Sequence, residues 1–125
     1  MTPRSSRAPS RSTVQPLPPA LTTVKAKSYF GLYSTTLRSA EKRTLRALVA
    51  QVPPGATVTA RATGMVRAEG ATSADKRRAL KRARAVRGYL RSLGLAGEIT
   101  VSNTGRTDSS TWKARRVNVV ITYTR

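Results

Sequence analysis

The residue types that carry out catalysis or bind transition metals are scarce in this sequence. Cysteine and histidine are both absent, which removes the thiolate nucleophile, the commonest general base and the commonest transition-metal ligands. Five carboxylates remain, and no two stand at a spacing that suggests a catalytic pair or a metal cage: Glu41, Glu69, Asp75, Glu98 and Asp108. We therefore expect a protein with no catalytic residues, no metal site and no cofactor.

Basic residues dominate the charge of the chain. Lysine and arginine number 24 against 5 aspartates and glutamates, so the formal net charge at pH 7 is +19 over 125 residues. Such a charge attracts nucleic acid, an anionic membrane surface or an anionic cell-wall polymer, and does not choose among them. Eighteen of the basic residues are arginine, whose forked guanidinium favours directed contacts to phosphate or carboxylate groups.

The start of the chain differs in composition from the rest. Residues 1–22 are rich in proline, serine, threonine and arginine, and they have too little apolar surface to offset the entropy of ordering. We predict a disordered tail or linker there and one domain over residues 23–125. No stretch approaches the roughly 20 apolar residues that span a bilayer, and no signal-peptide core follows the first basic residues. We expect a cell-envelope location if the chain is a fragment of an exported protein, and a cytoplasmic one if Met1 is the true start.

The hydrophobic pattern predicts alternating strands and helices. Leucines and valines at helical spacing follow Ser39, and apolar residues alternate in the segments 57–66 and 116–123, which is typical of half-buried strands. The predicted order β-α-β-α-β-β implies an α+β fold, a two-layer sandwich with two main helices on one face of a mixed sheet. The predicted elements are strand 25–32, a helix from 39, strand 57–66, a helix to about 93 capped by Ser73 or Asp75, and strands 98–104 and 116–123.

One arginine of the second helix falls on its apolar side. At 100° per residue an apolar arc forms, and Arg82 stands inside it, between Tyr89 and Leu93. A cation in that place requires a polar or anionic partner. The partner is either a bound ligand or an internal group, such as Asp75 or a backbone carbonyl. Most other basic residues of this helix lie outside the arc, and we expect them to face solvent.

The order and spacing of several motifs resemble the OmpA-like C-terminal domain family. That family's central signature reads G-H-T-D-x-x-G-x(4)-N-x-x-L-S-x-x-R-A-x-x-V-x-x-Y-L. Residues 64–70 read G-M-V-R-A-E-G here, and Asp75, Arg82-Ala83, Val86 and Tyr89-Leu90 follow without a gap. Residues 29–37 resemble the family's F-D-x-x-S-x-x-L segment, and residues 107–117 resemble T-x(6)-N-R-R-V. The resemblance covers about residues 25–125.

The resemblance implies a site that binds the peptide stem of peptidoglycan, often through diaminopimelate. In the family, the acid of G-H-T-D meets the ligand's ammonium and the arginine of R-A meets its carboxylate. Arg82 matches that arginine, whereas Arg67 stands in place of the acid and Asp75 in place of the asparagine. Two arginines suit a carboxylate-rich or phosphate-bearing ligand, and they repel an ammonium. Alternatively, Arg67 points to solvent and the site is degenerate.

Three further residues complete the predicted ligand site. Gly64 begins the central signature, and the family's arginine pair, here Arg115 and Arg116, supports the binding cleft and the fold. Because neighbouring residues of a strand face opposite sides, one of the two is equally consistent with an exposed strand end.

Three functions remain open from the sequence. The first is a non-catalytic binding module of the bacterial cell envelope, of the kind found in outer-membrane and cell-wall proteins, which binds peptidoglycan or an associated anionic wall polymer. The second is a nucleic-acid-binding module on the same scaffold, which the charge favours and the lack of a recognition motif disfavours. The third is a degenerate domain kept for contacts between proteins.

Overall fold

A computed structural model describes residues 21–107 and 114–124. Its elements follow the predicted order β-α-β-α-β-β, with one four-stranded sheet in the order β2-β5-β3-β4. Most of the predicted tail, together with Asp108, falls outside the described residues. Within the described part, no helix is both long and apolar enough to cross a membrane. The elements are β2 (Thr22–Tyr29), α2 (Ser39–Ala50), β3 (Thr57–Arg67), α3 (Ser73–Ser92), β4 (Glu98–Thr107) and β5 (Arg116–Thr124).

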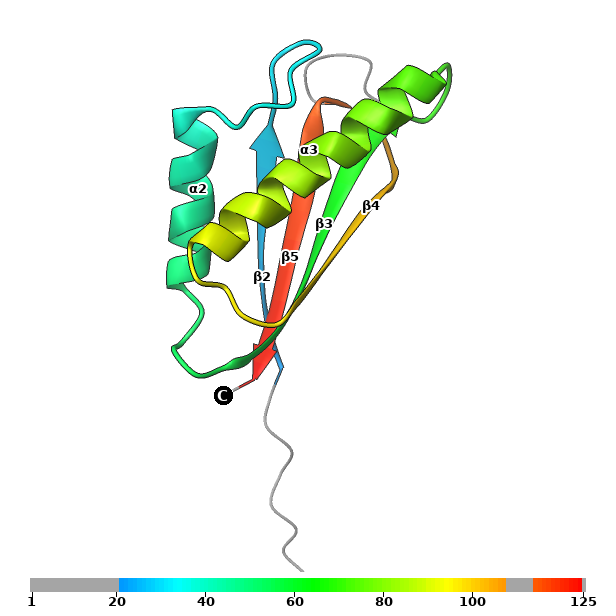
Figure 1. Ribbon diagram of the computed structural model, residues 1–125. Helices are drawn as coiled ribbons and strands as arrows, with labels where there is room; N and C mark the ends of the chain where they lie inside the picture. Colours follow the sequence, from blue (N-terminus) through cyan, green and yellow to red (C-terminus); the bar gives the residue numbers. More distant parts are fainter. Residues whose placement is uncertain (1–20, 108–113, 125) are drawn as a thin grey trace, which may run out of the picture.

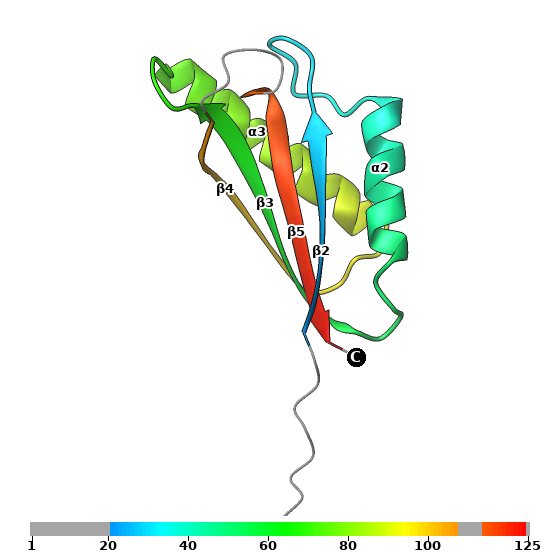
Figure 2. The ribbon, with the colours of Figure 1, turned by 180° about the vertical axis from the view of Figure 1, so that it is seen from behind.

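The sheet is mixed and is covered by helices on one face only. Strand β5 pairs antiparallel with both β2 and β3, and β3 pairs parallel with β4. Helices α2 and α3 lie on the same face, with α3 running diagonally across the strands (Figure 1). On the opposite face, residues 21–107 and 114–124 place no helix (Figure 2). The predicted α+β two-layer architecture is therefore confirmed.

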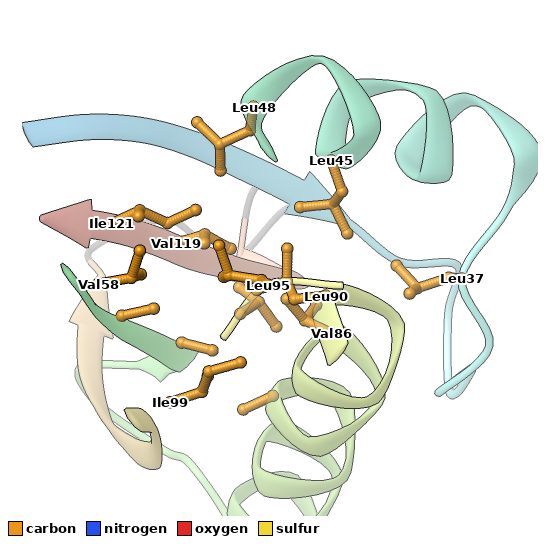
Figure 3. Close-up of a cluster of buried hydrophobic side chains, with 14 of the residues drawn as sticks. Leu37, Leu45, Leu48, Val58, Val86, Leu90, Leu95, Ile99, Val119 and Ile121 are labelled. Atoms are coloured by element: carbon orange, nitrogen blue, oxygen red, sulfur yellow. The ribbon is translucent and has the colours of Figure 1, made fainter. Parts of the chain in front are cut away.

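The core lies between the sheet and the two helices. Alternate residues of β5 face inward, so that Val117, Val119 and Ile121 are almost fully buried. Leucines of α2 and apolar side chains of α3 meet them from the helix layer (Figure 3). Burial of these apolar side chains is the main favourable contribution to folding. The apolar arc predicted for α3 is likewise the buried side of that helix: Ala79, Arg82, Ala83, Val86 and Leu90.

Strand β2 begins and ends three residues earlier than the predicted 25–32. It pairs with β5 along its whole length, from Thr22 opposite Tyr123 to Tyr29 opposite Arg116. The chain then leaves the sheet at residues 31–34, where Tyr33 adopts a φ of 58°. The aromatic pattern of this segment suggested a continuing strand, but the turn at Tyr33 ends it. Strand β4 runs on to Thr107, three residues beyond its predicted end, because it keeps its pairing with the end of β3.

Helix α3 is capped by Thr72, and the predicted cap at Ser73 or Asp75 was wrong. The side-chain oxygen of Thr72 accepts a hydrogen bond from the backbone N–H of Asp75 at 3.1 Å. In return, the Asp75 carboxylate accepts one from the backbone N–H of Thr72 at 3.0 Å. This reciprocal capping box satisfies two backbone donors that the first helical turn leaves unpaired. Asp75 therefore takes part in the cap, but from the third helical position.

Candidate functional site

A pocket of about 280 Å³ opens at the end of the molecule where α3 begins. In Figure 1 this is the upper end, where β3 ends and the loop after β2 turns back. Four arginines and one aspartate contribute to its wall, so its charged side chains carry a net excess of three positive charges. The lining residues are Leu32, Tyr33, Met65, Val66, Arg67, Asp75, Arg78, Arg82, Ala114 and Arg115.

Arg82 is buried at the base of this site, with 5% of its surface exposed. Its Nε donates a hydrogen bond to the backbone oxygen of Ser34 at 2.8 Å, and an Nη donates to that of Gly31 at 3.2 Å. The guanidinium also lies 5.5 Å from the centre of the Phe30 ring. Of the two partners that the sequence left open, the internal one is thus present, as two backbone carbonyls. Arg82 holds the loop after β2 against α3 and still lines the pocket.

The surroundings of Arg82 disfavour its charged form. Burial is the largest cause that lowers the pKa of Arg82, followed by the nearby guanidiniums of Arg78 and Arg115, whereas Asp75 opposes them; together they bring this pKa to about 10. At neutral pH the side chain therefore remains protonated. An anionic ligand in the pocket would stabilise the charged form of Arg82, which is close to two other guanidiniums and to one carboxylate.

The one carboxylate of the pocket is already engaged on several sides. Besides accepting from the backbone N–H of Thr72, Asp75 accepts from Nη1 of Arg78 at 3.2 Å. It also lies 3.6 Å from Nη2 of Arg67. The backbone hydrogen bond from Thr72 is the main cause of the lowered pKa of Asp75, so the group is ionised at neutral pH. Its negative charge is consequently shared with two arginines and the helix cap.

Arg67 reaches from the end of β3 to the start of α3. Its Nη2 donates to the backbone oxygen of Gly70 at 3.0 Å and lies near the Asp75 carboxylate. The side chain is 44% exposed, so Arg67 is only partly solvated. It lines the same pocket as Arg82. The two arginines singled out from the sequence thus share one site.

The remaining predicted site residues divide into two groups. Arg115 lines the pocket, and its Nε donates to the backbone oxygen of Phe30 at 3.1 Å. Arg116 belongs to β5 and donates to the Asn118 side chain at 3.0 Å, away from the pocket lining. Gly64 also lies outside the lining, and a Cβ there would collide with the backbone of Ala79. Because it has no side chain, Gly64 allows β3 to approach α3 closely.

Several residues of the pocket were not predicted as ligand-binding, and two of them, Arg78 and Tyr33, carry polar or aromatic side chains. Arg78 was assigned with its neighbours to the solvated side of the helix, yet it lines the pocket, and its guanidinium lies 4.9 Å from the centre of the Tyr33 ring. The spacing contained the signal, because Arg78 is three residues after Asp75 and four before Arg82, on one side of the helix. Tyr33 belongs to the segment 29–37 that resembles the family motif, but it was not predicted as a ligand-binding residue; the turn after β2 brings it to the pocket.

The fold that contains this pocket was compared with those of known proteins. No protein-family profile and no curated protein sequence matches the chain. The OmpA-like domain of FopA1 from Francisella tularensis is similar in structure, with a TM-score of 0.60 and 21% identity over 83% of this chain and 75% of that one. The peptidoglycan-associated lipoprotein from Burkholderia pseudomallei gives a TM-score of 0.56 and 22% identity over 76% and 88%.

A third solved structure agrees with these two. The periplasmic domain of MotB from Helicobacter pylori gives a TM-score of 0.52 and 15% identity, covering 82% of this chain and 74% of that one. Each of the three matches covers at least 76% of this chain. The resemblance drawn from the ordered motifs is therefore confirmed at the level of structure: the chain has the fold of an OmpA-like domain.

Proposed function

We propose that this protein is a non-catalytic binding module of the bacterial cell envelope. In this proposal its pocket holds an anionic group of a peptidoglycan stem peptide or of an associated anionic wall polymer. The shared fold supports the envelope setting, since one similar structure is that of a peptidoglycan-associated lipoprotein and another is a periplasmic domain. The observation that carries the proposal is the pocket in which four arginines surround one engaged carboxylate.

The donors available in the pocket suit a carboxylate. Arg82 uses Nε and one Nη for backbone carbonyls, and Arg115 uses Nε. Their remaining Nη groups have no hydrogen-bond partner among the described residues, and both side chains line the pocket. Guanidinium donors form short, charge-assisted and often paired hydrogen bonds with carboxylate or phosphate oxygens.

The same pocket disfavours a ligand that presents an ammonium group. The position where the family has an acid carries Arg67 instead, and the nearby Asp75 is shared between Arg67, Arg78 and the helix cap. An ammonium entering here would meet a net excess of positive charge. The proposed ligand is therefore recognised through its anionic groups, and an uncharged or acylated amine suits the site better than a free one.

Co-sedimentation with isolated peptidoglycan sacculi at physiological salt tests this function. The pocket variant Arg115→Gln is compared with Arg61→Gln, which removes the same charge from the exposed, helix-free face of the sheet. We expect Arg115→Gln to weaken binding by about tenfold or more, as loss of a charge-assisted hydrogen bond does, and Arg61→Gln to change it little. Thermal unfolding confirms that both variants fold.

Two outcomes would contradict the proposal. The first is a wild-type protein that does not sediment with sacculi at physiological salt. The second is an equal loss of binding in both variants, which would mean that only the total charge of the protein matters and that the pocket has no specific part in it.

A further inference from the structure

The exposed side of α3 carries a row of basic residues that the pocket does not use. In this helix, which holds eight basic residues and one acidic residue, the buried arc is centred on Ala79, Val86 and Leu90. At 100° per residue, the side of the helix that faces away from that arc carries Arg77, Lys81, Arg84, Gly88 and Arg91, with Gly88 directly opposite the arc, and all five are exposed. The row extends over roughly 21 Å along the helix axis at 1.5 Å per residue.

Helix α2 adds two positioned cations beside this row. The ammonium of Lys42 lies 5.6 Å from the centre of the Tyr89 ring, and Nη1 of Arg46 donates to the Tyr89 hydroxyl at 2.9 Å. Glu41, the one acid of α2, is turned away and accepts from the backbone N–H of Tyr29 at 2.8 Å. Six exposed cations therefore share one layer, which we call the basic helix face: Lys42, Arg46, Arg77, Lys81, Arg84 and Arg91.

Folding alone does not account for this arrangement. Like charges three or four residues apart on a helix repel one another, and such pairs recur along α3, as with Arg77 and Lys81. The acids of the two helices, Glu41 and Asp75, form no ion pair with any of the six. A layer that served only solubility would mix charges of both signs.

Gly88 stands in the middle of the row on α3, with basic residues on both sides. A Cβ at this position would have no neighbour within 4 Å, so packing does not require a glycine there. Glycine in the interior of a helix lowers its stability relative to alanine. What glycine provides is a helix surface without a side chain, to which an extended ligand can approach closely between Arg84 and Arg91.

We propose that the basic helix face binds the sugar-phosphate backbone of double-stranded nucleic acid, with one strand passing over Gly88. A duplex carries about one charge per 1.7 Å of its axis, so each cation of the face can meet a phosphate. A single strand is disfavoured because no exposed row of aromatic side chains is available for stacking in the described chain. This inference does not rest on the pocket or on the function proposed for it.

The absence of apolar anchors distinguishes this surface from a membrane-binding one. Helices that lie in a bilayer interface bury large apolar side chains beside their cations. Among the described residues, the large hydrophobic side chains that are exposed are Leu21, Leu32 and Tyr33, all outside α2 and α3. Nucleic acid requires only the cations that the two helices present.

Fluorescence anisotropy with a labelled duplex of arbitrary sequence, along a salt series, tests the proposal. The full chain carrying Lys42→Gln, Lys81→Gln and Arg84→Gln is compared with one carrying Lys25→Gln, Lys27→Gln and Arg61→Gln. The second set removes the same residue types from the helix-free face of the sheet. We expect the helix-face variant to bind at least about tenfold more weakly at low salt, with a salt slope smaller by about 2 to 3. The sheet-face variant should bind nearly as the wild type does.

A third variant, Gly88→Leu, tests the close approach without changing the charge. The open space around this position lets a leucine fit, and circular dichroism verifies that the helix is intact. Duplex binding should weaken several-fold. The proposal is overturned by equal losses in the two triple variants, by unchanged binding of Gly88→Leu, or by a helix-face variant that loses binding to anionic vesicles while it binds the duplex as before.

Discussion

At the scale of single residues, Arg82 combines two tasks. Its hydrogen bonds to the backbone of Gly31 and Ser34 fix the loop that forms one wall of the pocket. The same buried guanidinium faces the pocket with part of its donor capacity unused by the described residues. Replacing it with a small side chain would leave two carbonyls without their donor, so a loss of ligand binding in such a variant would mix a structural effect with a chemical one. Arg115 is the cleaner probe of binding.

Ser28 is a buried residue whose side chain has no partner. It lies in β2, is fully buried, and its hydroxyl has no hydrogen-bond partner among the described residues. Because an unsatisfied buried hydroxyl is costly, Ser28→Ala should raise the free energy of unfolding by about 1 kcal/mol. Urea denaturation of the two proteins measures this difference. A variant clearly less stable than the wild type would show that the hydroxyl has a partner in solution.

The sequence predicted individual residues where periodicity applies and failed where distant segments meet. The helical angle placed Arg82 correctly on the buried side of α3, because angle depends only on position along the helix. Its acceptors, Gly31 and Ser34, lie 51 and 48 residues away, and a backbone carbonyl has no signature in sequence. The position of Tyr33 in the pocket was not predicted either, because it also depends on how distant segments meet. Its place at the rim follows from the turn after β2.

At the scale of elements, the start of α3 connects the helix cap with the pocket. The pKa of Asp75 is lower in the folded protein than its ordinary value, chiefly because of the hydrogen bond from the backbone of Thr72. Its carboxylate therefore stabilises the fold fully above the unfolded pKa of roughly 3.9, and this stabilisation is lost as pH falls through the folded pKa. The cap and the charge balance of the pocket weaken together over that range.

The variant Asp75→Asn tests this coupling. It retains a side-chain oxygen for the cap but cannot ionise. We expect wild-type protein to be more stable than the variant above about pH 5, with the difference shrinking below about pH 4 as the carboxylate protonates. Urea midpoints across this pH range give the comparison. A difference that is independent of pH would mean that Asp75 does not stabilise the fold through its charge.

Gly64 of β3 faces the buried side of α3, whereas Gly88 lies on the exposed side of α3 itself. Substitutions at these two glycines can therefore be compared. In Gly64→Ala the new Cβ would collide with the backbone of Ala79, whereas in Gly88→Ala it would meet open space. We expect Gly64→Ala to lower the free energy of unfolding by about 1–3 kcal/mol through overpacking. Gly88→Ala should raise it by about 0.5–1 kcal/mol through helix propensity. Urea denaturation of both variants measures the contrast, and effects of the same sign would contradict the close contact between β3 and α3.

The sequence predicted which elements exist better than it predicted where they end. The alternation of β3 and β5 and the apolar arc of α3 were correct, since they reflect burial against one core. The ends of β2 and the cap of α3 were wrong, because pairing with β5 and the reciprocal bonds of Thr72 and Asp75 determine them. Several polar residues near a helix start can each serve as the cap, and the sequence does not rank them.

At the scale of the whole molecule, the charge works against the compact state. The formal net charge is +19. Three ion pairs join described residues to one another, and two of them share Asp75. Repulsion among the excess cations lowers the stability of the fold, and salt screens it. We expect the thermal midpoint to rise by several degrees between low and physiological salt. Differential scanning calorimetry measures it, and a midpoint that falls would show that attractive pairs outweigh the repulsion.

The fold of the whole molecule was recognisable from sequence although identity to similar structures is only about one fifth. The recognition came from the order and spacing of short motifs, which in this structure correspond to the contact of Gly64 with α3, the buried Arg82 and the apolar arc of α3. The charge pattern of the pocket is where the chain departs from the family signature. Arg67 stands where the signature has an acid, and Arg78 adds a guanidinium beside it.

The most direct test of the pocket uses two small ligands that differ only in their ammonium groups. Diaminopimelate and pimelate share the same dicarboxylate skeleton, and calorimetry can compare their binding to the wild type and to Arg67→Asp. We expect the wild type to bind pimelate about tenfold or more tightly than diaminopimelate, and Arg67→Asp to reverse that order, since each effect corresponds to a charge-assisted contact. Wild-type protein that binds diaminopimelate at least as tightly as pimelate, with no change in Arg67→Asp, would contradict an anion-selective pocket.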